Sequence, residues 1–400
     1  MPCRTAVALL AAVASLPAAA ASRYRTGGDC DGFPRVELTT ERPLCVGLVA
    51  DKLGFPRGLA VLGKDIFVLD MGAWGSRRGR LLILPDGGRG ARRVLISGLE
   101  RANAVAPGPG DTLYLGVKGK IVRLDPYAAD PAATLRDVVT GLPWTGRHPL
   151  SSLAVARDGT LYINVGSATN NCEKTDGSPP DPGIACPETR ETPPRASILR
   201  LLPVSPPYRA GRIAPYARGL RNSMALAVLP DGRLVAAGNA RDAINRLDPS
   251  LSDTALPHDT LHLVEPGADY GWPYCYDNRR PSPEYPRADC SRQPLAALLL
   301  PAHAAPLGLL HYTGRMARLA GHLIVAYHGY RAGGHRIVAI PMRQNRPSAP
   351  PRDIVSGWND VAGLRPMGAP VSLAALPDGS LLITEDRNGT LLRLSAPRDR

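Results

Sequence analysis

The chain has 400 residues, a formal net charge of +13 at pH 7, and 41 glycines and 41 prolines. Glycine and proline at this level favour many turns over long helices, so the composition predicts an all-β protein. The basic residues are mostly arginines scattered among acidic ones, without the alternation of aromatic and basic residues that stacks nucleic-acid bases. The charge therefore does not predict a nucleic-acid partner.

The first 21 residues have the pattern of a secretory signal peptide. One early cation, Arg4, precedes the apolar run Ala6–Leu16, and small residues follow up to Ala21. The run is shorter than the roughly 20 apolar residues that cross a bilayer, and no later stretch approaches that length. We therefore expect a signal peptide over 1–21, no transmembrane segment, and a mature protein that is periplasmic or secreted.

Six cysteines follow this segment, and an even number in an exported chain predicts disulfides. They form three local couples, although six cysteines allow about 15 connectivities. Pairing within each couple is favoured because a loop of this size stabilises by roughly 3 kcal/mol in the chain-entropy model. A zinc site is the alternative, but the chain has no close Cys-x-x-Cys pair. The expected disulfides are Cys30–Cys45, Cys172–Cys186 and Cys275–Cys290.

Six segments share one pattern, in which two β-prone runs flank a turn centred on glycine or Asp-Gly. Asp-Gly between alternating apolar residues predicts a β-hairpin, since both positions tolerate a positive φ. Six such hairpins predict a six-bladed β-propeller over 55–396, after an N-terminal segment over 22–54 that contains Cys30 and Cys45. The hairpins are Arg57–Asp70 around Gly63, Asn103–Val117 around Gly110-Asp111, Ser152–Val165 around Asp158-Gly159, Ala225–Ala237 around Asp231-Gly232, Leu307–Tyr327 around Gly321, and Val371–Thr384 around Asp378-Gly379.

Two long insertions interrupt this repeat, at Asn170–Pro207 and Pro257–Pro301. Both are rich in proline, and each contains one cysteine couple. Long ordered loops on a rigid scaffold usually build binding surfaces. They can also cover exposed blade edges, and the two roles are compatible. The predicted fold is thus a propeller with long, disulfide-stapled loop insertions.

The segment Gly219–Cys275 carries the most specific motif. It contains Gly219-Leu220-Arg221-Asn222, Asn239, Asp242, Asp259 and Tyr270-Gly271-Trp272-Pro273. This combination resembles the motif block of the quinoprotein glucose and sorbosone dehydrogenases, and similarity around Pro301–Gly308 and His328-Gly329 extends the resemblance over most of the mature chain. The resemblance implies a six-bladed propeller that oxidises sugars with pyrroloquinoline quinone (PQQ) and Ca²⁺.

His148 lies five residues before the apolar run Leu153–Val155 and ten before Asp158, so it should lie where the chain enters an inner strand, at the axial mouth. In the resembling family a histidine at this spacing is the general base, and an ordinary imidazole pKa of about 6.5 suits that role. A lone histidine is more often structural. The resemblance assigns His148 as the catalytic base.

Arg221 and Asn222 match the family's Arg-Asn pair. A guanidinium can hold a carboxylate of the tricarboxylic quinone in a bidentate fork and stabilise the charge that develops as hydride arrives. The resemblance implies that Arg221 is catalytic and that both residues bind the cofactor. The dipeptide alone would be read as a surface arginine beside a turn-forming asparagine.

Further residues are expected around the cofactor and its metal. The resemblance implies Ca²⁺ at the backbone carbonyls of Gly238 and Asn239. Asp259 lies eleven residues before Tyr270, as the family's acidic residue does, with Asp242 as an alternative; either can be a turn residue. The cofactor-binding candidates are Arg221, Asn222, Asn239, Asp259, His328 and Arg331, and His303 is a further candidate for the cavity.

The chain also departs from the resembling family. Ala369 stands before Pro370-Val371 where many relatives have an arginine that contacts the quinone, and Arg147 stands before the base where the glucose-oxidising branch has an aspartate. Arg365 or Arg331 could reach the region of the missing arginine. These departures argue against glucose as the substrate and leave a cofactor-free descendant open.

Two hypotheses from different classes follow. The favoured one is a PQQ- and Ca²⁺-dependent dehydrogenase that oxidises a sugar or sugar aldehyde and passes electrons to a soluble or membrane acceptor, a quinone or a cytochrome. The alternative is a non-catalytic propeller that binds a glycan or a protein through its loop face. A metal-dependent lactonase is a third, but the sequence lacks a convincing Glu, Asn and Asp set for its metal.

Overall fold

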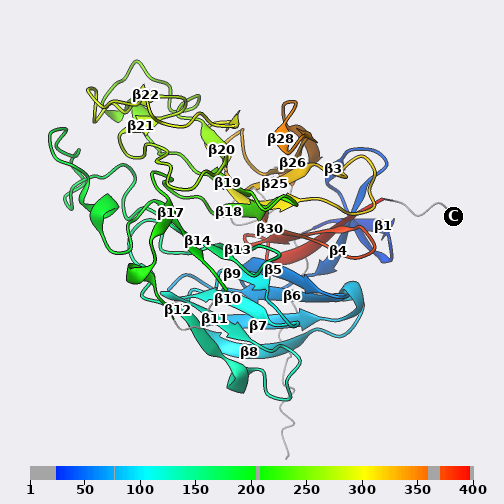
Figure 1. Cartoon of the computed structure of the whole chain (residues 1–400). Coiled ribbons are helices and arrows are strands. Elements are labelled where there is room, and N and C mark those ends of the chain that lie inside the picture. The colour runs from blue at the N-terminus through cyan, green and yellow to red at the C-terminus, as the bar shows by residue number, and fades with distance from the viewer. Residues whose placement is uncertain (1–23, 76, 204–207, 359–369, 397–400) are drawn as a thin grey trace, which may run out of the picture.

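The computed structural model describes residues 24–75, 77–203, 208–358 and 370–396. In this part of the chain, six sheets of four or more mainly antiparallel strands surround a central axis (Figure 1). The first strand of each sheet contacts the first strands of both neighbouring sheets, which closes a ring. The predicted all-β, six-bladed propeller is confirmed.

The blades follow the chain order. Blade 1 contains β5 (Pro56–Leu62), β6 (Asp65–Asp70), β7 (Gly79–Leu84) and β8 (Arg93–Leu99), and blade 2 contains β9 (Ala104–Pro107), β10 (Leu113–Val117), β11 (Lys120–Leu124) and β12 (Arg136–Thr140). Blade 3 contains β13 (Leu153–Val155), β14 (Leu161–Val165), β15 (Ser197–Leu201) and β17 (Pro215–Ala217), and blade 4 contains β18 (Ala225–Val228), β19 (Leu234–Gly238), β20 (Asp259–Leu263) and β23 (Leu298–Leu300). Blade 5 contains β24 (Pro306–His311), β25 (Leu323–Tyr327), β26 (Arg336–Ile340) and β29 (Arg352–Ser356), and blade 6 contains β30 (Pro370–Ala375), β31 (Leu381–Glu385), β32 (Thr390–Ser395) and β4 (Cys45–Ala50).

The remaining elements are short. β1 (Thr26–Cys30) and β2 (Phe33–Val36) extend blade 6, β3 (Thr39–Thr40) extends blade 5, and β16 (Tyr208–Arg209) extends blade 2. Two small hairpins pair β21 (Cys275–Tyr276) with β22 (Arg280–Pro281) and β27 (Met342–Arg343) with β28 (Arg346–Pro347). The described helices are single 3₁₀ turns: η1 (Asp86–Gly88), η2 (Ala132–Thr134), η3 (Pro187–Arg190), η4 (Ala210–Arg212) and η5 (Ile244–Arg246).

All six predicted hairpins are present as the first two strands of a blade. The expected turn geometry is wrong in detail, because in the turns at 158–159, 231–232 and 378–379 only the glycine has a positive φ, of 84°, 85° and 92°. The aspartate caps the turn instead: Asp158 Oδ1 accepts a hydrogen bond from the Thr160 N–H at 2.9 Å. Aspartate favours turns through this local hydrogen bond as well as through its tolerance of positive φ.

The core lies between neighbouring blades rather than at the axis. In β6, Ile66 and Val68 pack toward blade 6, whereas Phe67 and Leu69 pack toward blade 2, and all four are fully buried. Because both faces of a blade are covered, its second strand is a continuous apolar run rather than an alternating one. Each blade is therefore held by apolar contacts on both sides.

The N-terminal segment closes the ring. β4 pairs with β32, so the outer strand of the last blade comes from the start of the chain, and Figure 1 shows the blue strands β1 and β4 beside the red C-terminal strands. Tyr24 lies in the same region, where its hydroxyl contacts buried Glu385 and accepts a hydrogen bond from Trp358 Nε1 at 2.9 Å. The propeller thus extends into the segment 22–54.

The three predicted disulfides are confirmed: Cys30–Cys45, Cys172–Cys186 and Cys275–Cys290. The insertions are shorter than predicted, because β15, β20 and β23 lie within their predicted bounds and belong to blades. The loops proper span 166–196 and 264–297.

All inner strands begin at one end of the propeller, and the chain returns to that end between the second and third strands of each blade. Loops from all six blades therefore meet there, the first insertion among them. The second insertion reaches the same end, where Trp272 Nε1 donates to the Asn170 carbonyl at 3.3 Å. In the described ranges no helix is long and apolar enough to cross a membrane. The predicted signal peptide over 1–21, Arg365 and Ala369 lie outside the described residues.

Candidate active site

A cavity of about 390 Å³ opens at this end, between blades 3, 4 and 5. Gly238 is not in its wall; it lines a smaller cavity of about 60 Å³ that shares Arg221 and Asn239 with the larger one. The structure thus brings together motifs that are far apart in the sequence. The wall of the larger cavity contains all the predicted catalytic and cofactor-binding residues: His148, Arg221, Asn222, Asn239, Asp259, His328 and Arg331. It also contains Arg147, Asp242 and His303.

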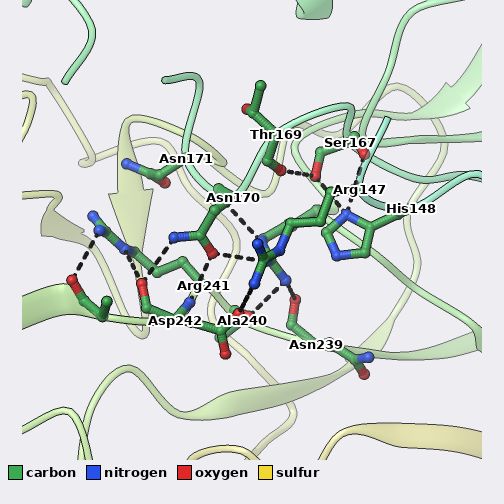
Figure 2. Close-up of polar contacts among 12 residues, drawn as sticks. Arg147, His148, Ser167, Thr169, Asn170, Asn171, Asn239, Ala240, Arg241 and Asp242 are labelled. Atoms are coloured by element: carbon green, nitrogen blue, oxygen red, sulfur yellow. Dashed lines mark hydrogen bonds and ion pairs between the residues drawn. The ribbon is translucent and has the colours of Figure 1, made fainter. Parts of the chain in front are cut away.

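His148 is held in one tautomer by Ser167 (Figure 2). The Ser167 hydroxyl donates to the Thr169 carbonyl at 2.7 Å, so its oxygen accepts from His148 Nδ1 at 2.9 Å. The Ser167 carbonyl also accepts from Nδ1, at 3.1 Å. Nδ1 therefore carries the proton of the neutral ring, and Nε2 keeps a lone pair that can accept a proton.

The surroundings of His148 oppose its protonation. Burial, together with the charges of Arg221 and Arg147, lowers the pKa of His148 to about 2. The ring is consequently neutral at physiological pH, which is the form that a general base requires.

Gly166 leaves room for His148 and Asn222, which both lie close to its backbone. A Cβ at this position would lie 2.5 Å from His148 Cβ and 3.1 Å from Asn222 Oδ1, and the first distance is too short for any side chain. No local pattern marks Gly166, because the neighbours that require glycine there lie 18 and 56 residues away.

Arg221 is a buried structural centre as well as a wall residue. Its Nε donates to the Asn170 carbonyl and its Nη2 to Asn170 Oδ1, both at 2.8 Å. Its Nη1 donates to the carbonyls of Ala240 at 2.7 Å and Asn239 at 3.2 Å. Burial lowers the pKa of Arg221 to about 10, so the group stays charged. A ligand carboxylate would therefore have to replace one of these protein oxygens to receive the predicted fork.

Two asparagines offer buried acceptors near this guanidinium. The Oδ1 atoms of Asn222 and Asn239 are buried and have no hydrogen-bond partner among the described residues. A buried acceptor without a partner costs on the order of 1–3 kcal/mol, and such atoms are rare in native proteins unless a ligand or water binds them. Both atoms therefore remain as acceptors for a ligand or a water molecule.

The two candidate aspartates differ in their roles. Asp259 is buried and accepts from the N–H groups of Ala240 at 2.7 Å and Ala305 at 2.6 Å, which joins blade 4 to blade 5. Burial raises the pKa of Asp259 to about 6. Asp242 lies at the mouth of the cavity and pairs with Arg147 at 2.6 Å. Burial raises the pKa of Asp242, but the hydrogen bond from His303 and the charges of Arg221 and Arg147 lower it strongly.

A chain of charges continues across the mouth from Asp242. His303 Nδ1 lies 3.3 Å from Asp242 Oδ1, and its Nε2 donates to the Asp253 carbonyl at 2.6 Å. Arg331 pairs with the Asp253 carboxylate at 2.8 Å. Since both nitrogens of His303 face acceptors, the doubly protonated ring fits this position best.

His328 lies in the wall beyond this chain of charges, with two partners that the sequence did not indicate. Its Nε2 lies 3.1 and 3.2 Å from the two carboxylate oxygens of Asp386, and Arg57 Nη1 pairs with Asp386 Oδ2 at 2.7 Å. These residues open blade 1 and follow β31, so only ring closure brings them together.

The two insertions meet beside the cavity. Glu284 of the second insertion contacts the guanidinium of Arg241 and accepts from Asn171 Nδ2 of the first insertion at 2.9 Å. The Cys186 N–H donates to the Tyr274 hydroxyl at 2.8 Å. Arg241 precedes Asp242 of the cavity wall, so this contact holds the loop that forms one side of the cavity.

Comparison of the sequence with family models gives no match, and no curated protein matches it. Solved structures do share the fold. A Trichoderma reesei protein of carbohydrate-active enzyme family AA12 has a TM-score of 0.75 at 20% identity, covering 93% of this chain and 100% of that one. The holo PQQ domain of pyranose dehydrogenase from Coprinopsis cinerea has a TM-score of 0.70 at 20% identity, covering 92% and 99%. PQQ-bound aldose sugar dehydrogenase from Streptomyces coelicolor has a TM-score of 0.62 at 18% identity, covering 89% and 99%. At this identity the likeness establishes the propeller fold.

Proposed function

We propose that this chain is a periplasmic or secreted dehydrogenase that uses PQQ and Ca²⁺ to oxidise a sugar or sugar aldehyde. The observation that carries the proposal is the tautomer of His148, whose Nε2 is left as a base in a cavity walled by arginines. The fold supports it, because the structures that share the fold are described as PQQ-containing sugar dehydrogenases and an AA12 enzyme.

The residues present fit a tricarboxylic quinone and a hard cation. Arg147, Arg221 and Arg331 place positive charge in the wall, where carboxylates would bind. The unpartnered Oδ1 atoms of Asn222 and Asn239 are suitable hydrogen-bond acceptors or Ca²⁺ ligands. The Asn239 carbonyl already accepts from Arg221, so Ca²⁺ at the proposed Gly238 and Asn239 carbonyls would share that oxygen with the guanidinium.

When bound, PQQ with Ca²⁺ would supply the hydride acceptor and a Lewis acid. His148 would accept the proton of the sugar hydroxyl at Nε2 while Ser167 holds the ring by Nδ1. An anionic ligand would offset the charges of Arg147 and Arg221, which lower the pKa of His148, and so make the ring a stronger base. Electrons would then leave to a soluble or membrane acceptor.

Calorimetric titration of the purified protein with PQQ, with and without Ca²⁺, tests the proposal. Tight binding that requires Ca²⁺ and weakens in Arg221→Ala is expected, together with sugar-dependent bleaching of the oxidised cofactor. His148→Ala should bind PQQ but lose turnover by about 10²–10⁴-fold. The control is His322→Ala, because His322 precedes β25 at the end of the propeller away from the cavity; this variant should behave as the wild type.

No binding at high PQQ and Ca²⁺ concentrations would reject the dehydrogenase. The chain would then be treated as a propeller that binds a glycan or a protein through its loop face.

A further inference from the structure

His328 is another imidazole of the cavity wall. It follows β25 of blade 5, whereas His148 precedes β13 of blade 3. Its side chain is 12% exposed, while that of Asp386 is 0% exposed. The two residues come from the neighbouring blades 5 and 6 and lie 58 residues apart in the sequence, so their contact depends on how the blades pack in the ring.

Asp386 fixes the tautomer of His328. Although burial raises the pKa of Asp386, hydrogen bonds from His328 and Arg57 and the charge of Arg57 lower it, so Asp386 is an ionised acceptor. Only a protonated Nε2 can donate to its oxygens, at 3.1 and 3.2 Å. In the neutral ring of His328 the lone pair is therefore on Nδ1, the reverse of His148.

The electrostatic surroundings of the two histidines also differ. His148 is flanked by Arg147 and Arg221, which oppose an imidazolium. His328 instead contacts the carboxylate of Asp386. That carboxylate also pairs with Arg57 at 2.7 Å, so its negative charge is balanced while His328 is neutral. A proton added at Nδ1 of His328 would leave the hydrogen bonds from Nε2 to Asp386 in place.

We propose that His328, oriented by Asp386, accepts one of the protons released when the reduced cofactor is reoxidised. This inference rests on the proposed function. Return of a quinol to its quinone breaks two O–H bonds and releases two electrons and two protons. The two electrons would go, one at a time, to two equivalents of a one-electron acceptor. His148 would by then have passed the proton taken from the sugar hydroxyl to the reduced cofactor, so its Nε2 would be free to take one of the two protons, and the other would form an N–H bond at His328 Nδ1. Asp386 is a positioning residue and stays ionised.

The first arm of the test needs no cofactor. Nitrogen-15 NMR of the imidazoles distinguishes protonated from unprotonated ring nitrogens, and His328→Gln assigns the signals. In the wild type, the neutral ring of His328 should be protonated at Nε2, and the neutral ring of His148 should be protonated at Nδ1. Asp386→Asn should give a mixture of tautomers or the opposite tautomer at His328 and leave the tautomer of His148 unchanged. An unprotonated Nε2 at His328 in the wild-type protein would overturn the proposal.

The second arm separates the two half-reactions by stopped-flow absorbance of the PQQ-loaded protein. His328→Gln should slow reoxidation by a one-electron acceptor by about 10–100-fold, which is several-fold more than it slows sugar-driven reduction. Thermal melting would confirm that the variant is folded, and His322→Gln is the matched control.

The possible failures are distinguishable. If the wild type binds no PQQ, the proposed function fails and this inference fails with it. If the wild type turns over but His328→Gln reoxidises at the wild-type rate, or slows both half-reactions equally, only the role of His328 is rejected.

Discussion

At the scale of single residues, Arg221 combines structural and chemical roles. Its guanidinium satisfies the oxygens of Asn170, Asn239 and Ala240, all of which belong to cavity loops. Arg221→Ala leaves these acceptors without their donor, and we expect the free energy of unfolding to fall by about 3 kcal/mol or more. Urea unfolding followed by tryptophan fluorescence measures this change.

Arg147 is the matched control because it lines the same cavity but pairs with Asp242 at the surface. The two side chains are 49% and 43% exposed, so Arg147→Ala should cost less than about 1 kcal/mol. Similar losses in the two variants would show that the hydrogen bonds of Arg221 contribute little to stability.

At the scale of elements, His303 makes the loop after β19 sensitive to pH. The hydrogen bond to Asp242 raises the pKa of His303, although burial opposes this. A raised pKa in the folded state means that the stabilising contact is complete below about 6.5, the ordinary value, and is lost as the pH rises through the folded-state value. We expect amide hydrogens of residues 239–258 to exchange faster at pH 8.5 than at pH 5.5, after correction for intrinsic rates.

His303→Gln should remove most of this pH dependence, since an amide does not titrate in this range. A loop in the wild-type protein whose protection is independent of pH would contradict the prediction. Asp242, Asp253 and Arg331 also surround the ring. Asp259, whose pKa burial raises to about 6, accepts from the Ala240 N–H of the same loop; its ionisation strengthens that bond as the pH rises and so acts against the effect of His303.

The contact between the insertions is a second prediction at this scale. Glu284→Ala leaves Arg241, whose side chain is 5% exposed, without its counter-charge. Breaking a buried ion pair from one side typically costs about 3–5 kcal/mol. Here we expect the loss to appear as increased hydrogen exchange in 166–196, 239–258 and 264–297, with blade strands β5–β8 unaffected. Glu265→Ala, in the same insertion but on the surface, is the control; equal exchange in both variants would reject the role of Glu284.

The sequence predicted these elements unevenly. All six hairpins were predicted from their turn residues, because residues such as Gly63 and Asp158-Gly159 favour a turn whatever surrounds them. The insertion bounds were wrong because β15 and β23 are short strands in proline-rich surroundings, where only pairing with a neighbour defines a strand. His148 and Arg221 were found through their motifs, whereas Asp386 and Arg57 were missed because they act only after the ring closes and no local pattern precedes them.

At the scale of the whole molecule, the ring depends on the disulfide Cys30–Cys45 and on β4. Cys45 begins the strand that completes blade 6, and Cys30 ends β1 of the same sheet. Replacing both cysteines by serine should lower the global stability by about 2–4 kcal/mol. Replacing Cys275 and Cys290, which staple a surface insertion, should loosen that insertion and change the main unfolding transition less.

Differential scanning calorimetry compares the two double variants. The prediction is contradicted if removal of Cys275–Cys290 lowers the main melting temperature as much as removal of Cys30–Cys45.

Pairing of β4 with β32 also has a consequence for biosynthesis. The ribosome makes β4 about 350 residues before β32, since Cys45 lies opposite Ser395 in the strand ladder. Until β32 is made, β4 can pair with β2 on one edge but its other edge stays open, which exposes the nascent chain to wrong partners and to chaperones. Conversely, a prematurely terminated product can never complete blade 6, so the architecture itself discriminates between finished and unfinished polypeptides before any ligand is bound.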